Sequence, residues 1–198
     1  MSLPRIPVER MKAEPGTLHA LIFENLKIGL PRALFYDLEI PLAPFDSGLP
    51  GDAPDIAKRF RLNFLQLPAP DWRRLDGRTF ELEADAADGS IYLGNAHNPV
   101  DLPRLEFRNL EGCRFQVEAR LNCDFEFENV ALSDTVELAT TVEFKGLRII
   151  NWLLDDVQDK ASRAKDLLKE LAAPEAYAAE PSFGRTFWTP VFIPSPSV

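Results

Sequence analysis

The fold is decided by one stretch of the chain, residues 114–127, which reads RFQVEARLNCDFEF. Every odd position from Phe115 to Phe127 is apolar, and every even position carries a polar or charged side chain. A strict period of two is typical of a β-strand with one buried face and one wet face. Strands of a parallel sheet that is covered on both sides would read as continuous apolar runs instead. The stretch therefore predicts a strand of an antiparallel sheet.

Alternation of the same kind marks five further segments. They are residues 34–42, 60–64, 79–84, 104–108 and 136–144. After them, apolar residues recur at helical spacing, between a cap at Asp155 or Asp156 and a stop at Pro174. We expect this helix to cover an exposed face or an open edge of the sheet. The predicted fold class is α+β, mainly β: a curved or two-layer, meander-like antiparallel sheet of about seven to nine strands with one C-terminal helix.

The length of 198 residues fits a single domain, residues 1–198. Residues 1–16 contain three prolines and are expected to form a flexible N-terminal arm. Residues 173–198 contain five prolines with aromatic residues between them. Because disordered tails are poor in aromatic residues, we expect this C-terminal tail to dock on the domain.

The charge balance restricts the partners. A net charge of −9 argues against nucleic acid and against anionic membrane surfaces, since both require a basic footprint. It permits a basic protein as partner, because complementary fields speed and select association. The alternative is that the acidic charge serves solubility alone. The chain has no apolar run of the roughly 18 residues that a spanning helix requires, so we expect no membrane insertion.

Only two cysteines are present, Cys113 and Cys123. On one extended strand they would lie roughly 33 Å apart, far beyond the roughly 6 Å that a disulfide spans. Two free thiols, together with the lack of a secretory signal pattern, predict a cytoplasmic protein.

The first group of candidate binding residues lies in residues 89–101, which are predicted to form a strand followed by a polar loop. There Asn95, His97, Asn98 and Asp101 could orient one another around a ligand, since loops carry function often. The structural alternative is that the Asn, Gly and Pro residues of this segment make the turn, while His97 and Asp101 hydrogen-bond the loop backbone.

The second group lies on the polar side of the stretch 114–127. Glu118, Asp124 and Glu126 would present carboxylates on one face, which could receive a basic protein. The alternative is a solvated face, because Arg114 and Arg120 alternate with these acids and suggest cross-strand ion pairs.

Catalytic signatures are missing from the sequence. Two histidines and two cysteines do not supply a convincing zinc site, and no glycine-rich phosphate loop occurs. We therefore expect no catalytic residues, no metal and no cofactor.

Residues 89–107 resemble small stand-alone bacterial β-rich proteins of unassigned function. The resemblance rests on the segments SIYLG at 90–94, NPVD at 98–101 and RLEF at 104–107. Some of these proteins are immunity-protein-like, and immunity proteins neutralise a cognate toxin by binding it. The resemblance implies a non-catalytic binding protein, of toxin-neutralising type.

Two alternatives stay open. The 14 phenylalanines could line an apolar cavity in a curved sheet, as in a small-molecule or lipid binder. The other alternative is a hydrolase that uses His97 and nearby carboxylates.

Overall fold

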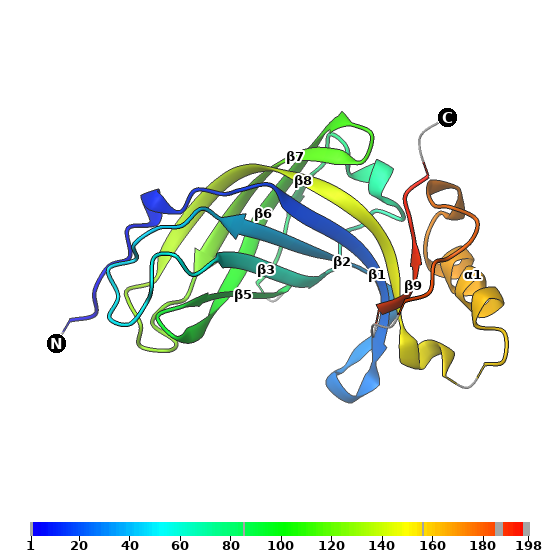
Figure 1. The fold of residues 1–198 in the computed structure, drawn as a ribbon, viewed down its shortest axis with the longest axis horizontal. Helices are drawn as coiled ribbons and strands as arrows, with labels where there is room; N and C mark the ends of the chain where they lie inside the picture. Colours follow the sequence, from blue (N-terminus) through cyan, green and yellow to red (C-terminus); the bar gives the residue numbers. More distant parts are fainter. Residues whose placement is uncertain (1, 85, 156, 185–187, 196–198) are drawn as a thin grey trace.

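The computed structural model describes residues 2–84, 86–155, 157–184 and 188–195. Within them, nine strands form one sheet, and a single α-helix follows near the C terminus (Figure 1). The strands are β1 (Gly16–Asn25), β2 (Leu30–Leu42), β3 (Lys58–Leu65), β4 (Thr79–Glu81), β5 (Asp88–Leu93), β6 (Ala96–Glu111), β7 (Arg114–Cys123), β8 (Asp134–Ile150) and β9 (Trp188–Phe192). The mainly β fold class with a C-terminal helix is confirmed.

The sheet curls until it closes on itself. Neighbouring strands follow the order β1, β2, β3, β5, β6, β7, β8, and β1 also pairs with β8. All the pairings are antiparallel except this last one, in which Gly16–Ile22 runs parallel to the second half of β8. Two short strands lie outside the ring, since β4 pairs with β6 and β9 pairs with β8. Closure removes the exposed edges that an open sheet would present.

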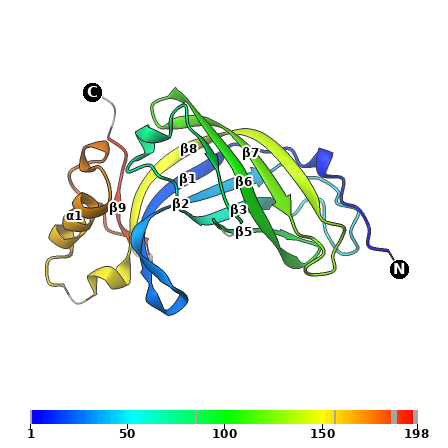
Figure 2. The ribbon, with the colours of Figure 1, turned by 180° about the vertical axis from the view of Figure 1, so that it is seen from behind.

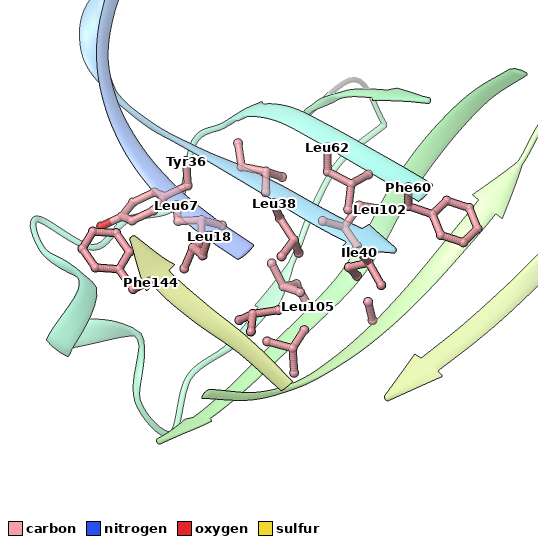
Figure 3. Close-up of a cluster of buried hydrophobic side chains, with 14 of the residues drawn as sticks. Leu18, Tyr36, Leu38, Ile40, Phe60, Leu62, Leu67, Leu102, Leu105 and Phe144 are labelled. Atoms are coloured by element: carbon pink, nitrogen blue, oxygen red, sulfur yellow. The ribbon is translucent and has the colours of Figure 1, made fainter. Parts of the chain in front are cut away.

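Because apolar and polar residues alternate along the strands, every second side chain points into the ring. Figure 3 shows Leu18, Leu38 and Leu105, from three different strands, converging on the interior. Aromatic rings continue this core in a chain of contacts, with centroid distances of 6.2 Å for Phe80–Phe107, 5.8 Å for Phe107–Phe115, 6.3 Å for Phe115–Trp72 and 5.7 Å for Trp72–Phe144. Contact between the rings shows that they serve as core, as small closed sheets usually require.

A second, smaller apolar cluster lies on the outer side of β1, β2 and β8. Its buried members are Leu21, Phe23, Phe35 and Ile150. Phe64 packs against them with a positive φ of 57°, which turns its side chain away from the alternation that the sequence predicts for residues 60–64. The cause is a register shift between β2 and β3 at this point, which is a bulge-like irregularity.

The helix α1 (Lys160–Leu171) begins later than the sequence predicts. Its cap is Asp159, whose carboxylate accepts a hydrogen bond from the Ser162 amide, at 3.0 Å. The expected cap at Asp155 is therefore wrong, because residues Asn151–Leu154 form a short 3-10 helix that ends there. Asp156 lies outside the described residues.

The buried side of α1 joins the main core instead of covering a face of the sheet. Ala164, Leu167 and Leu168 belong to that core, and the helix lies at the end of the molecule opposite the N terminus (Figure 1 and Figure 2). The C-terminal tail follows it and returns along β8 as β9. The tail also contacts the interior, since the indole of Trp72 donates to the carbonyl oxygen of Ala176, at 3.1 Å.

The N-terminal segment contributes to the core as well. Ile6 and Met11 are 4% exposed, and the hydroxyl of Thr140 donates to the carbonyl oxygen of Glu14.

Both cysteines are free thiols, and burial raises the pKa of Cys123 to about 12, which keeps this thiol uncharged. None of the helices in the described part of the chain has the length and hydrophobicity needed to cross a membrane.

Candidate binding cleft

The predicted polar loop after residue 93 is a two-residue turn, so that prediction is wrong. Gly94 and Asn95 connect β5 to β6, and their positive φ angles of 61° and 63° are those of the tight turns that join antiparallel strands. Strand pairing resumes at once, with His97 opposite Tyr92. Of the four candidates in this region, Asn95 alone lies in the turn, while His97, Asn98 and Asp101 lie on β6.

The side chain of Asn98 points inward and is fully buried. Its amide nitrogen donates to the carbonyl oxygens of Ile91, Leu93 and Ala96, at 3.3, 3.0 and 3.1 Å. A buried amide with three backbone partners secures the hairpin and offers no donor to a ligand. This arrangement corresponds to a structural role for Asn98.

A surface cleft of about 260 Å³ lies outside the ring, across β3, β5 and β6. We call it the His97 cleft. It is lined by Ala57, Lys58, Arg59, Arg61, Ser90, Tyr92 and His97. These side chains meet because Arg61 pairs with Ser90 across β3 and β5, and Tyr92 pairs with His97 across β5 and β6. The cleft thus combines two guanidinium groups, an imidazole and two hydroxyls on rigid strands.

The two arginines of the cleft share one carboxylate on β2. Glu39 lies 2.9 Å from Nη1 of Arg59 and 3.7 Å from Nε of Arg61. The side chains of Arg59 and Arg61 are 41% and 54% exposed, so this ion pairing is solvated and weak. Glu39 therefore holds the two guanidinium groups near each other without neutralising both.

Three side chains of the cleft have unused hydrogen-bonding capacity. Among the described residues, Ser90, Tyr92 and His97 make no side-chain hydrogen bond or ion pair. The contact that orients His97 is with the ring of Tyr92, at a centroid distance of 5.0 Å and an angle of 64° between planes. Their polar atoms are therefore free to bind a ligand or water.

Lys58 lines the cleft but does not add its charge to it. The Nζ atom of Lys58 lies 3.3 Å from the Asp52 carboxylate and 3.0 Å from the carbonyl oxygen of Ala53, to which it donates. The side chain is 2% exposed.

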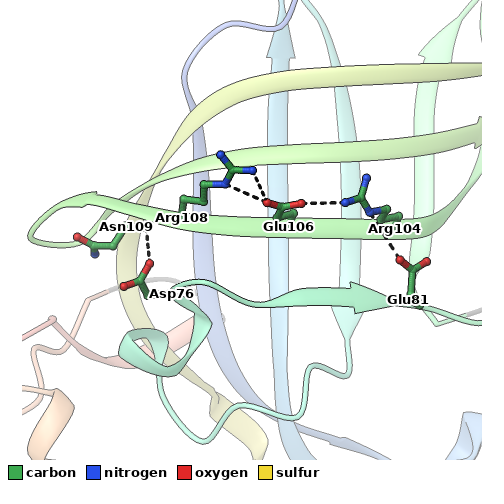
Figure 4. A network of polar contacts seen from close by, with 6 residues as sticks. All are labelled: Asp76, Glu81, Arg104, Glu106, Arg108 and Asn109. Carbon is green, nitrogen blue, oxygen red and sulfur yellow. Dashed lines mark hydrogen bonds and ion pairs between the residues drawn. The ribbon is translucent and has the colours of Figure 1, made fainter.

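The outer face of β6, β7 and β8 carries charges of both signs. Figure 4 shows Glu106 between Arg104 and Arg108, which donate to its carboxylate at 2.9 and 2.7 Å. The hydrogen bond from Arg108 holds the pKa of Glu106 below its ordinary value. Glu118 lies opposite Glu106, whereas Arg120 lies opposite Glu137. This face is a mosaic of opposite charges, not a continuous acidic surface.

Asp124 and Glu126 do not share the strand face with Glu118, because β7 ends at Cys123. The Asp124 carboxylate accepts hydrogen bonds from the amide of Phe127 and the hydroxyl of Ser133, each at 3.0 Å. Glu126 accepts from the Ser133 amide at 3.4 Å. Both acids therefore close the loop between β7 and β8.

Another polar group lies between β1, β2 and β8. The guanidinium of Arg148 donates to Nε2 of His19, and the carboxylate of Asp37 accepts from the Phe64 amide at 3.0 Å. Burial, together with the positive charges of Arg148 and Lys145, lowers the pKa of His19 to about 4. Burial also raises the pKa of Asp37 to about 6, despite the nearby guanidinium of Arg148. The pKa values of His19 and Asp37 are therefore shifted in opposite directions.

Asp101, which the hydrolase alternative pairs with His97, does not lie beside it. Asp101 is four residues from His97 along the same extended strand, so their Cα atoms are roughly 13 Å apart. Among the described residues, no three His, Cys, Asp or Glu side chains are grouped in a way that could hold a metal ion.

The comparisons with known proteins find no match, whether with family models, with curated proteins or with solved structures. Sequence reasoning selected His97 but missed Arg59, Arg61 and Tyr92. The available signal was the alternation in residues 58–62, which places both arginines on the outer face.

Proposed function

We propose that this chain is a non-catalytic binding protein and that it holds its ligand or partner in the His97 cleft. The observation that carries the proposal is the set of free polar groups on Ser90, Tyr92 and His97 beside two solvated guanidinium groups. The pairing of β3, β5 and β6 fixes the backbone positions from which these side chains project, which favours selective recognition.

Two features support binding over catalysis. His97 contacts an aromatic ring, and no carboxylate among the described residues lines the cleft to orient its imidazole. On the charged face of β6 to β8, which the sequence suggested for a basic partner, Glu106 is paired with Arg104 and Arg108, and Asp124 and Glu126 bond within the loop after β7. The toxin-neutralising role stays a prediction, and it does not depend on that face.

The test is quantitative capture with matched variants. Immobilised wild-type protein, a cleft variant with Tyr92→Ala and His97→Ala, and a control with Asp101→Asn and Phe127→Ala are exposed to host lysate and to its small-molecule fraction. Asp101 and Phe127 are exposed and lie outside the cleft, and Phe127 is 66% exposed. Mass spectrometry then quantifies what each retains.

The proposal predicts a molecule that is retained by the wild type and the control but is lost from the cleft variant, and that leaves the protein chemically unchanged. Retention that is equal on all three proteins would contradict the cleft as the binding surface. Chemical conversion of the retained molecule would contradict the non-catalytic part of the proposal.

A further inference from the structure

The charge of the His97 cleft differs in sign from the charge of the whole chain. Arg59 and Arg61 contribute two positive charges to the cleft. Glu39, which pairs with both arginines but does not line the cleft, contributes one negative charge. Lys58 is neutralised by Asp52 and is left out of this balance. A cleft with surplus positive charge in a protein of net charge −9 is therefore a local feature, not a consequence of composition.

A second depression of the same protein provides a comparison. A hollow of about 290 Å³ over Ala139, which we call the Ala139 hollow, is also lined by two arginines, Arg104 and Arg120. There, however, Glu118 and Glu137 line it as well, so that the two signs balance. The two sites are similar in volume and in arginine content, and they differ in whether carboxylates line them.

From this difference we infer that the His97 cleft binds an oxyanion, the carboxylate or phosphate group of a larger molecule. The inference rests on the proposed function and names its ligand class. Guanidinium groups present paired N–H donors that match the oxygens of both groups. The free hydroxyls of Ser90 and Tyr92 and the ring of His97 provide further hydrogen-bonding partners within the same cleft.

The volume of the cleft and the exposed ring of Tyr92 indicate which part of the ligand enters the cleft. The cleft, at about 260 Å³, is smaller than the roughly 300–1,000 Å³ of pockets that enclose a whole drug-sized ligand. It therefore takes the charged head of the molecule, while the rest lies outside. Tyr92 is 48% exposed beside the cleft, and its ring offers a flat apolar surface to that remainder.

Isothermal titration with four simple probes tests this inference. Phenyl phosphate and benzoate carry the oxyanion on a flat ring, whereas phenol and benzylamine replace it with a neutral or a cationic group. We expect both anions to bind about ten-fold or more tightly than phenol and benzylamine, and more weakly at higher salt. The tighter of the two anions identifies phosphate or carboxylate as the preferred group.

Three variants accompany the titration. R59Q/R61Q is expected to lose about ten-fold or more in affinity for the anions, while the control R104Q/R120Q, in the Ala139 hollow, keeps the wild-type value. E39Q frees both arginines from their shared carboxylate and is expected to tighten binding a few-fold. Because E39Q predicts a gain, it remains informative if R59Q/R61Q fails to fold.

Several results would overturn the oxyanion inference. Among them are equal binding of benzylamine and phenyl phosphate, an equal loss in the control variant, and unchanged or weaker binding by E39Q. If these occur while capture still depends on Tyr92 and His97, the proposed function stands and the ligand class is wrong. If capture also fails to depend on the cleft, both are wrong.

Discussion

Tyr92 on β5 and His97 on β6 lie directly opposite each other, with their ring centroids 5.0 Å apart. Their contact fixes the imidazole at the rim of the cleft while Tyr92 remains half exposed. The pair thus combines a positioned polar group with an apolar platform, and this combination makes the site suitable for binding.

The first prediction separates the ring of Tyr92 from its hydroxyl. Tyr92→Phe keeps the ring surface and should bind phenyl phosphate within a few-fold of wild type. Tyr92→Ala loses the surface and should bind roughly 5- to 30-fold more weakly. Because Tyr92 is half exposed, neither variant should lower the free energy of unfolding by more than about 1 kcal/mol. Titration and urea unfolding check both statements, and equal affinities of Y92F and Y92A would refute the platform role.

The second prediction concerns Asn98, whose amide supplies donors to three carbonyl oxygens. Asn98→Asp would direct a carboxylate at those oxygens without any donor, and a buried unpaired charge is strongly unfavourable. We expect a loss of about 3 kcal/mol or more in the free energy of unfolding, against about 1–3 kcal/mol for Asn98→Leu. Urea unfolding of both variants measures this order, and N98D equal in stability to wild type would contradict the assigned role.

Much of this architecture can be predicted from the sequence, for physical reasons. Residues 114–123 alternate strictly, and they form β7 with the expected buried and wet faces. Alternation depends only on the local period, so it identifies strands but not their partners. The closure of the ring by β1 and β8 joins residues more than 120 positions apart, such as Gly16 and Val142, and no local pattern encodes it.

The same limit explains the partial prediction of the site. His97 stood out as one of two histidines, but its neighbours Arg59 and Arg61 belong to β3, which reaches β6 through β5. Which strands are adjacent is decided by the packing of the whole core. Asn98, by contrast, is a binding candidate in the sequence because its segment reads as a polar loop, whereas in the structure it lies buried on β6.

The third prediction uses the backbone of Phe64. At a φ of 57° a side chain is strained, whereas glycine is not. Phe64→Gly should therefore be more stable than Phe64→Ala by about 1 kcal/mol, the reverse of the usual order in strands. Both should be less stable than wild type, since they lose ring contacts with Phe23 and Phe35. Thermal unfolding of Phe64→Gly and Phe64→Ala measures this difference. A higher unfolding temperature for the alanine variant would show that the backbone at residue 64 is not strained.

The fourth prediction concerns pH and the opposed groups His19 and Asp37. The pKa of Asp37 is about 6 in the folded chain and about 4 when unfolded, so a rise in pH from 4 to 6 disfavours folding. The pKa of His19 is about 4 when folded and about 6.5 when unfolded, so the same rise favours folding. The two contributions should largely cancel in the wild type.

Single variants should expose each contribution. D37N leaves His19 unopposed, and its stability relative to wild type should rise between pH 4 and pH 6.5, by on the order of 2 kcal/mol. H19Q leaves Asp37 unopposed, and its relative stability should fall over the same range. Urea unfolding at several pH values measures both slopes. Slopes of the same sign in the two variants would show that these groups do not oppose each other.

The most direct test of the central claim is amide chemical-shift mapping of the ¹⁵N-labelled protein during titration with phenyl phosphate. The account predicts that the largest shifts fall on residues 57–61, 90–92 and 97, and that they vanish in R59Q/R61Q. Shifts centred on Arg104, Arg120 and Ala139 instead, or shifts that persist in that variant, would contradict it.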